Sequence, residues 1–321
     1  MIERALEEIF SPRRAPPGLA EPWKHVGEYA RRPGKRLRPR LVGVGWQAAG
    51  GALPLPRDVL RFGAGLELLH AFFLVHDDIA DKADTRRGGP ALHHVLGEGR
   101  LGENLAVVAG DLLFVEAMDA LLSCDFPQTG RAVREVLAIC RDTAAGQYLD
   151  LAFADADPEA VPPSAARRAE MLKTARYSFE APLVAGAMLA GGNERMIAAL
   201  RLLARPLGLA FQLQDDLLPL RLGDAAGKPA LADLAGGKKT WLMTLAWRAL
   251  DELGRARLRK LTERGDLEGV FALLRSSGAV ARVEREVCRL CAISLKAARK
   301  PALRRVRREL EAVVEKVAVC P

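Results

Sequence analysis

The sequence has few cysteines, few aromatic side chains and no zinc-ligand pattern. It contains five cysteines in 321 residues, and its first residues, MIERALEEIF, carry acids and lack the apolar core of a secretory signal. An odd cysteine count without an export signal predicts free thiols. Cys288 and Cys291 form a C-x-x-C pair, but a structural zinc site needs four ligands and no second pair exists.

Long apolar runs free of charge and breakers are also missing. The longest uncharged stretch, Leu41–Pro56, is interrupted by glycines and prolines, so we expect no transmembrane segment and a cytoplasmic protein. The net charge of +8 suits anionic partners without choosing among them. The basic stretch Ala281–Val317 has helical spacing and no aromatic residue, which favours a solvated helix face over a nucleic-acid surface.

Alternating β-branched runs are scarce, whereas apolar residues recur every three or four positions, as in Leu66, Leu69 and Phe73. Alanine and leucine dominate, and both favour helices. No composition shift marks a boundary. The sequence therefore predicts an all-α fold and one large helical domain over residues 1–321, with a partly flexible segment at 1–22. The predicted loops lie at Arg13–Pro22, Gly50–Pro56, Arg87–Pro90, Asp155–Pro163, Gly191–Asn193 and Leu222–Gly237.

A first acidic cluster ends the apolar run LLHAFFLVHDDIAD. Asp77 and Asp81 are four residues apart, so on a helix both carboxylates point the same way, with Asp78 beside them. Three acids repel one another unless a cation joins them, and Mg²⁺ fits when a phosphate supplies further ligands. Alone, the motif is more often an exposed acidic turn. Nearby, Arg86 and Arg87 have the guanidinium shape that binds phosphate, and His70 lies two helical turns before Asp77.

A second acidic pair, Asp215 and Asp216, follows another apolar helical run, with Gln212 one turn earlier. Basic segments accompany both pairs. Each would more often be a surface patch, but two acidic and four basic clusters in an apolar helical chain indicate a bound diphosphate–magnesium complex. The basic segments are Gly34–Pro39, Arg86–Arg87, Lys173–Thr174, and the loop that contains Lys228 and Lys238.

These motifs, in this order, resemble the trans-isoprenyl diphosphate synthases, or polyprenyl synthetases. The resemblance runs from about Gly34 to Thr240 and rests on GKRLRP, LLHAFF, DDIAD with RRGGP, GQYLDL, KT, FQLQDD and GGKKT. It implies long helices around a deep central apolar cavity, a homodimer, isoprenoid diphosphate substrates, and three Mg²⁺ ions held between the two Asp motifs.

The resemblance also implies a role for each matched residue. Asp77, Asp81 and Asp215 would bind Mg²⁺ directly, supported by Asp78 and Asp216. The allylic diphosphate would be bound by Arg86, Lys173, Gln212, Lys228 and Lys238, with Thr174 nearby. Isopentenyl diphosphate would be bound by Lys35, Arg38, His70 and Arg87, and Gly34 would let that substrate approach the backbone.

Two positions depart from the family pattern. Pro219 stands where the second motif usually has a further Asp, and it should end or bend the helix there. Pro33 stands where the family usually has Gly. Pro219 keeps open a cyclase-like terpene synthase, which ionises a diphosphate without condensation. A non-catalytic partner subunit that binds isoprenoid diphosphates is a further alternative.

Product length can be argued from sterics. Phe72 and Phe73 precede Asp77 by about one helical turn, roughly 5.4 Å, where a growing chain would pass. Two rings there should close the tunnel early, which predicts farnesyl diphosphate first, geranyl second and geranylgeranyl third. The alternative is that both rings pack into a helix interface.

Overall fold

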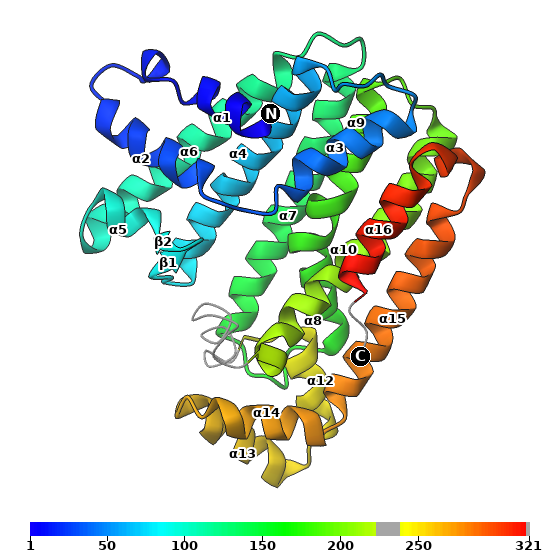
Figure 1. The fold of residues 1–321 in the computed structure, drawn as a ribbon. Coiled ribbons are helices and arrows are strands. Elements are labelled where there is room, and N and C mark those ends of the chain that lie inside the picture. The colour runs from blue at the N-terminus through cyan, green and yellow to red at the C-terminus, as the bar shows by residue number, and fades with distance from the viewer. Residues whose placement is uncertain (223–237, 319–321) are drawn as a thin grey trace. The chain divides into compact units, whose positions relative to one another are not determined.

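The computed structural model describes residues 1–222 and 238–318, and nearly all of them lie in helices (Figure 1). The only strands among these residues are β1 (Thr85–Arg86) and β2 (Gly89–Pro90), which pair antiparallel in a small hairpin. The all-α prediction is confirmed. The described chain divides into two compact units. Unit 1 contains Met1–Glu135 and Pro182–Ile197, and unit 2 contains Val136–Ala181 and Ala198–Pro321.

Unit 1 is built on the long helix α4, which packs against α3 and α6. Because α4 carries apolar residues all round, Phe62, Leu66 and Leu69 are fully buried. The N-terminal residues, for which the sequence predicts a partly flexible segment, include a helix, α1, whose Leu6 and Ile9 are buried. The helices of this unit are α1 (Ile2–Ile9), η1 (Pro12–Arg14), α2 (Ala20–Arg31), α3 (Leu37–Ala48), α4 (Arg57–Ala80), α5 (Leu92–Leu96), α6 (Gly99–Leu122) and α9 (Ala181–Leu189).

Unit 2 surrounds a π-helix, η2, which contains the Lys173–Thr174 pair. Such helices are rare and occur often at functional sites. A Cβ at Gly146 of α7 would lie 2.3 Å from the backbone nitrogen of Lys173, so only glycine lets α7 approach η2 this closely. The helices are α7 (Thr129–Ala154), α8 (Pro163–Glu170), η2 (Met171–Glu180), α10 (Glu194–Leu222), α12 (Trp241–Ala249), α13 (Glu252–Glu263), α14 (Leu267–Ser276), α15 (Ala279–Ala298), η4 (Pro301–Val306) and α16 (Arg307–Val317).

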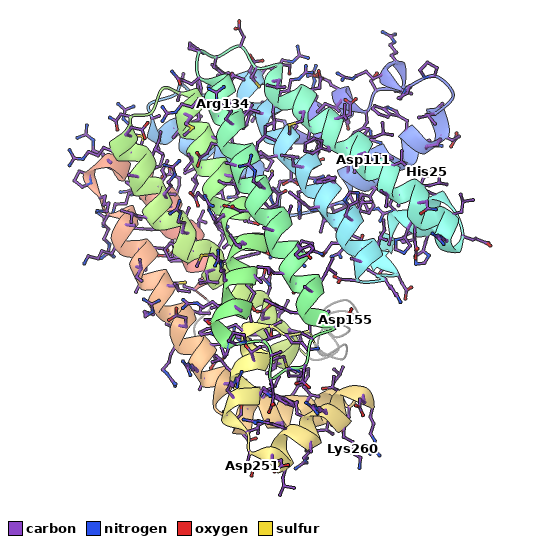
Figure 2. All side chains as sticks on the ribbon, turned by 180° about the vertical axis from the view of Figure 1, so that it is seen from behind. His25, Asp111, Arg134, Asp155, Asp251 and Lys260 are labelled. Atoms are coloured by element: carbon purple, nitrogen blue, oxygen red, sulfur yellow. The ribbon has the colours of Figure 1, made fainter. Side chains whose placement is uncertain are left out.

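Charged side chains cover the outer faces of these helices. In Figure 2, Asp111 on α6 and Lys260 on α13 point away from the helix packing, and both are exposed. The basic stretch predicted at Ala281–Val317 forms α15, η4 and α16, with apolar residues such as Val287, Leu303 and Leu310 buried beneath it. This arrangement agrees with a solvated helix face.

Two sequence expectations need correction. Helix α10 continues through Pro219 to Leu222, so that proline does not end the helix. Near a C-terminus, proline removes only one backbone hydrogen bond, and neighbouring packing can compensate for it. Cys124, Cys140 and Cys291 are free, as expected, but Cys288 is disulfide-bonded. Cys320 lies outside the described residues.

Helices α4 and α10 are long and apolar enough to cross a membrane by length and composition. The sequence alone predicted no transmembrane segment. Of their most apolar windows, 61% and 56% respectively are buried inside the protein. Core helices of water-soluble proteins have the same character, so two such helices are weak evidence for a membrane protein.

Candidate active site

The first acidic site lies where α4 ends, and its three acids differ in how exposed they are to solvent. Asp81 is exposed and Asp77 is half-buried, whereas Asp78 is completely buried. The backbone N–H of Asp81 donates to the Asp77 carbonyl at 2.8 Å, so the helical turn continues to Asp81. The i, i+4 pair predicted from the sequence therefore lies on the accessible face, where its carboxylates can reach a cation.

Asp78 faces inward and is held by two long-range partners. The Tyr29 hydroxyl donates to its Oδ2 at 2.8 Å, and the Arg86 Nε donates to its Oδ1 at 2.7 Å. Burial raises the pKa of Asp78, although Arg86 and Tyr29 both oppose this shift. Because these donors occupy both oxygens, Asp78 supports the site from within and is no candidate for direct metal contact.

The predicted isopentenyl-site residues lie in unit 1, and two of them, Gly34 and His70, have Arg87 as a neighbour. A Cβ at Gly34 would lie 3.3 Å from the Arg87 guanidinium carbon, so Gly34 leaves room for that side chain. Burial lowers the pKa of His70 well below its ordinary value, and the charges of Arg38 and Arg87 lower it further. Burial and neighbouring arginines also lower the pKa of Arg87. A neutral histidine among crowded cations suits a bound anion.

Not every basic residue of this motif faces the same way. Arg36 is nearly buried and pairs with Glu3 at 2.8 Å and Glu67 at 3.1 Å, so it stabilises unit 1 internally. Lys35, the neighbouring residue, is exposed. In the sequence these residues form one basic patch. In the structure Arg36 is paired inside unit 1, and only Lys35 of the two is accessible to a ligand.

The second acidic site lies on α10 in unit 2. Asp215 is exposed, while Asp216 is half-buried and accepts a 2.9 Å hydrogen bond from Gln212. Lys173 of η2 contacts Asp150 of α7 at 2.8 Å, and Lys238, which precedes α12, contacts the same carboxylate at 3.3 Å. Asp150 thereby joins two lysines that are far apart in sequence.

Two residues predicted for this second site need separate mention. Thr174 is half-buried in η2, next to Lys173. Lys228 lies outside the described residues. Its predicted contact with the allylic diphosphate stays a prediction.

Asp216 has a second neighbour, Glu170, at the end of α8. The Trp241 backbone N–H donates to Glu170 Oε1 at 2.6 Å, which satisfies one free N–H at the start of α12. The other oxygens, Glu170 Oε2 and Asp216 Oδ2, are buried and meet no donor from a third residue. Burial, followed by the charge of Asp216, raises the pKa of Glu170 well above its ordinary value, and burial raises that of Asp216 to about 6. Burial next to Asp216 therefore favours the protonated form of Glu170.

The predicted chain-length residues belong to an aromatic cluster in unit 1. Phe72 and Phe73 have ring centroids 4.9 Å apart, and Phe72 lies 5.4 Å from Phe114 of α6 and 4.7 Å from His76. Phe72, Phe73 and Phe114 are all half-buried. The alternative that these rings pack into a helix interface is therefore correct in part, because Phe72 packs on Phe114 of α6. The three rings are nevertheless only half-buried, so they also present apolar surface about one turn before Asp77.

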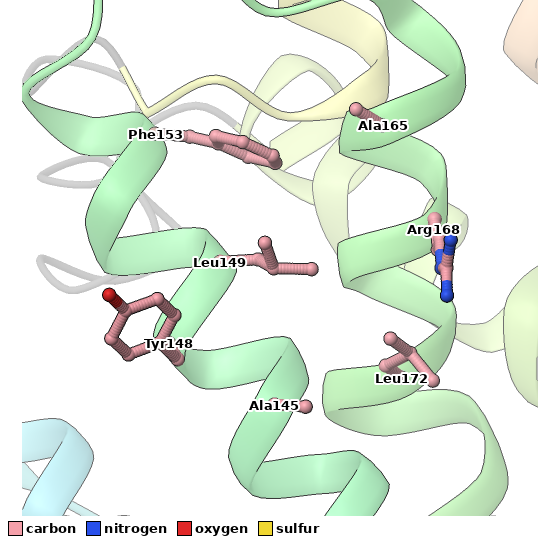
Figure 3. Close-up of a pocket in the computed structure, with 7 residues that line it drawn as sticks. All are labelled: Ala145, Tyr148, Leu149, Phe153, Ala165, Arg168 and Leu172. Atoms are coloured by element: carbon pink, nitrogen blue, oxygen red, sulfur yellow. The ribbon is translucent and has the colours of Figure 1, made fainter.

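Unit 2 also contains a cavity of about 580 Å³ between α7 and α8 (Figure 3). Leu149, Phe153 and Leu172 point into it, and Arg168 lies at its edge. Leu149 and Leu172 adjoin Asp150 and Lys173 in sequence. The residues that line the cavity are mainly apolar and include no carboxylate.

The donor atoms at both acidic sites fit a hard cation. Asp77, Asp81 and Asp215 present accessible carboxylate oxygens, the ligand type that Mg²⁺ prefers. Among the described residues, no group of three or more His, Cys, Asp or Glu side chains is arranged to hold a metal by itself. Magnesium would therefore be shared with the diphosphate, as Mg²⁺ in phosphate-transfer sites commonly is.

Sequence reasoning missed Tyr29, Glu170, Asp150 and Phe114. Tyr29 and Phe114 are separated from their partners by 49 and 42 residues, so no local spacing pattern could connect them. Of these four residues, Asp150 alone could have been found from the sequence, because it lies in the GQYLDL motif. Glu170 gave none, since an acid beside Arg167 and Arg168 predicts an ordinary surface pair.

Comparison with known proteins gives one consistent result. The family model described as Polyprenyl synthetase matches residues 21–272. A short chain isoprenyl diphosphate synthase of Methanothermobacter thermautotrophicus is 36% identical over 237 residues, which are 73% of this chain and 69% of that protein. A (2E,6E)-farnesyl diphosphate synthase of Mycobacterium bovis is 36% identical over 66% of this chain and 56% of its own length.

Solved structures agree with these sequence relatives. The crystal structure of geranylgeranyl pyrophosphate synthase from Corynebacterium glutamicum, complexed with isoprenyl diphosphate and magnesium, superposes with a TM-score of 0.86. Its sequence is 28% identical to this one, and the match covers 100% of this chain and 98% of that chain.

Proposed function

The chain belongs to the polyprenyl synthetase family and is a short-chain trans-prenyltransferase, and on that premise we propose that its main product is farnesyl diphosphate. The cluster of Phe72, Phe73 and Phe114 supports this product length. It lies about one turn before Asp77, so a chain growing away from the diphosphate would meet three rings early. Relatives named for farnesyl and for geranylgeranyl products both exist, which leaves geranyl and geranylgeranyl diphosphate as the alternatives to test.

We propose that the two substrates bind on different basic groups. The allylic diphosphate would contact Arg86, Lys173, Gln212, Lys228 and Lys238, with Thr174 nearby. Isopentenyl diphosphate would bind at Lys35, Arg38, His70 and Arg87, where a neutral His70 lies near the positive charges of Arg38 and Arg87. The guanidinium groups of these arginines have the shape that binds a diphosphate.

Asp77, Asp81 and Asp215 would hold magnesium, for which we propose three ions with the allylic diphosphate. When bound, magnesium supplies positive charge that stabilises the departing diphosphate. The chain's own contribution to this step is Arg86, Lys173 and Lys238, whose fixed cations stabilise the same developing charge. Asp150 keeps the two lysines at one place before substrate arrives.

The reaction then follows from binding and orientation. The allylic C–O bond breaks, and the carbocation lies against apolar walls that exclude water. The double bond of isopentenyl diphosphate forms the new C–C bond, which requires the two substrates to be held head to tail. A proton leaves the carbon next to the new cation, and the released diphosphate accepts it.

We also propose a cytoplasmic homodimer. On α6, Leu101, Leu105, Val108, Val115 and Leu122 follow a three-four repeat and are 42–63% exposed. An exposed apolar stripe of this length favours burial against another helix. Light scattering of the purified protein should give a dimer, and Val108→Glu should shift it toward monomer. A monomeric wild type would contradict the proposal.

Product analysis tests the proposed function. Purified protein is incubated with isopentenyl diphosphate, Mg²⁺ and each allylic starter in turn, and the products are separated by chain length. Farnesyl diphosphate as the main product supports the proposal. Cyclic hydrocarbon without isopentenyl diphosphate would indicate a cyclase, and activity only after addition of a second protein would indicate a partner subunit.

A further inference from the structure

The end of α2 lies beneath the hairpin that carries Arg86 and Arg87. Tyr29 is 2% exposed, and its hydroxyl donates to Asp78, which itself contacts Arg86 through Nε and Nη2. Tyr29 and Arg86 thus share one completely buried carboxylate. Since Arg86 uses two of its three nitrogens on Asp78, the position of Asp78 determines where the remaining nitrogen can meet a ligand.

Arg32, three residues after Tyr29, holds the backbone of the same hairpin. Its Nη1 donates to the Arg86 carbonyl at 3.1 Å and to the Pro90 carbonyl at 2.7 Å. The side chain is only 6% exposed, and its guanidinium carbon lies 5.0 Å from the Tyr29 ring centroid. A Cβ at Gly89 would lie 2.8 Å from that carbon, so glycine at this position admits Arg32.

We infer that Tyr29 and Arg32 are positioning residues for the substrate-binding arginines, Tyr29 for Arg86 alone and Arg32 for Arg86 and Arg87 together. Tyr29 acts on one side chain, through Asp78. Arg32 acts on the hairpin backbone, from which both arginines project. The assignment of Arg86 to the allylic substrate and Arg87 to isopentenyl diphosphate rests on the proposed function.

This division predicts different kinetic signatures. Tyr29→Phe keeps the ring and its packing but removes the bond to Asp78, so KM for the allylic diphosphate should rise about tenfold while KM for isopentenyl diphosphate changes less than about twofold. Arg32→Lys keeps a charge but loses the planar guanidinium, whose Nε and Nη2 donate to Glu28 while Nη1 donates to the two hairpin carbonyls, so both KM values should rise. A purely structural role for Tyr29 would lower the amount of folded protein without separating the two KM values.

Calorimetry and kinetics together test the inference. Wild type, Tyr29→Phe, Arg32→Lys and the matched control Tyr148→Phe, at a tyrosine that is 74% exposed, are titrated with inorganic diphosphate and Mg²⁺, and their KM values are measured. Thermal unfolding verifies that each variant is folded. We expect weaker diphosphate binding in Tyr29→Phe and Arg32→Lys and no change in Tyr148→Phe.

The outcomes separate two failures. If wild type does not condense substrates but Tyr29→Phe still weakens diphosphate binding, the proposed function fails and the positioning role stands. If Tyr29→Phe binds diphosphate as wild type does and raises neither KM, the positioning role is overturned whatever the activity. Should Arg32→Lys not fold, Tyr29→Phe decides alone.

Discussion

At the first acidic site the inward acid, Asp78, faces a phenol and a guanidinium, whereas at the second the inward acid, Asp216, faces an amide and another acid. Tyr29 and Arg86 donate to Asp78, while Gln212 and Glu170 surround Asp216. Both acids follow the first Asp of a motif, and sequence alone would give them one role. Their surroundings give them different ones.

The difference concerns how charge is balanced before any ligand binds. Asp78 is compensated by Arg86, so the first site keeps its geometry without a cation. The second site instead places two acids together, and the nearby cations Lys173 and Lys238 pair with Asp150. The outward acids, by contrast, are similar at the two sites, since Asp77, Asp81 and Asp215 are all accessible to solvent. Substitutions of the outward acids should therefore have similar effects, whereas substitutions of Asp78 and Asp216 should have different ones.

The largest effect should come from an outward acid. Asp215→Ala removes the only outward carboxylate of the second motif, so kcat/KM should fall by about 10³-fold, as when one preorganised stabilising group is lost. Asp77→Ala should behave alike if both sites share one ionisation step. The measurement is steady-state condensation over a range of Mg²⁺ concentrations, with the exposed Glu252→Ala as control. Full activity of Asp215→Ala would mean that the outward acid of the second site is not required for the reaction.

Product length should respond to unit 1 only. Replacing Phe72 and Phe73 together by alanine opens the space before Asp77, so products should lengthen from 15 carbons to 20 or more by adding five-carbon units, without loss of the starter reaction. Chromatography of the dephosphorylated products measures this change. Phe126→Ala, at a ring that packs on Trp46 elsewhere in unit 1, serves as control. Unchanged chain length would assign the ring pair to helix packing alone.

The inward acids should differ in their contribution to stability. Asp78→Ala leaves the buried Tyr29 hydroxyl and Arg86 without their acceptor, which should cost about 3 kcal/mol of unfolding free energy. Asp216→Ala also removes the hydrogen bond from Gln212. However, it removes the repulsion between Asp216 and the buried Glu170 as well, which offsets part of the loss. Burial raises the folded pKa of both acids, that of Asp216 to about 6, so each ionised carboxylate lowers stability at pH 7. The two variants should differ because only Asp78 is the acceptor of a buried phenol and a guanidinium.

Denaturant unfolding without magnesium or substrate measures both variants. We expect Asp216→Ala to change stability by about 1 kcal/mol or less. Equal losses in the two proteins would mean that the surroundings of Asp78 and Asp216 do not distinguish them. Glu170→Gln is the matched control, because its amide can donate to Asp216 and its carbonyl can accept from Trp241 without sharing a proton.

Much of the fold could be predicted because helical periodicity is a local signal. Leu66, Leu69 and Phe73 recur at helical spacing, and all lie in α4. The π-helix at Lys173 could not be predicted, since its close approach to Gly146 depends on a helix about 27 residues away. Pro219 shows the opposite case. A local rule predicted a helix end or bend there, and the predicted end is wrong because α10 continues to Leu222.

The candidate site divides in the same way. Asp77, Asp81 and Arg86 were found because their spacing is short and their motif is specific. Tyr29, Arg32 and Glu170 were missed because each acts through a partner many residues away, and each alone resembles an ordinary surface or core residue. Packing, rather than pattern, brings these residues to the site.

His70 provides the smallest effect and has no counterpart at the second acidic site among the described residues. Burial and the charges of Arg38 and Arg87 keep its folded pKa well below the unfolded value near 6.5. As pH falls below about 6.5, His70 becomes protonated in the unfolded chain but stays neutral in the folded protein. The free energy of unfolding contributed by His70 is therefore constant above that pH and declines below it. His70→Gln should make this decline shallower by up to ~1.4 kcal/mol per pH unit. Urea unfolding of both proteins from pH 8 to 5, without substrate or magnesium, measures the slopes. They should coincide above pH 6.5, and equal slopes below it would mean that the arginines around His70 do not hold it neutral.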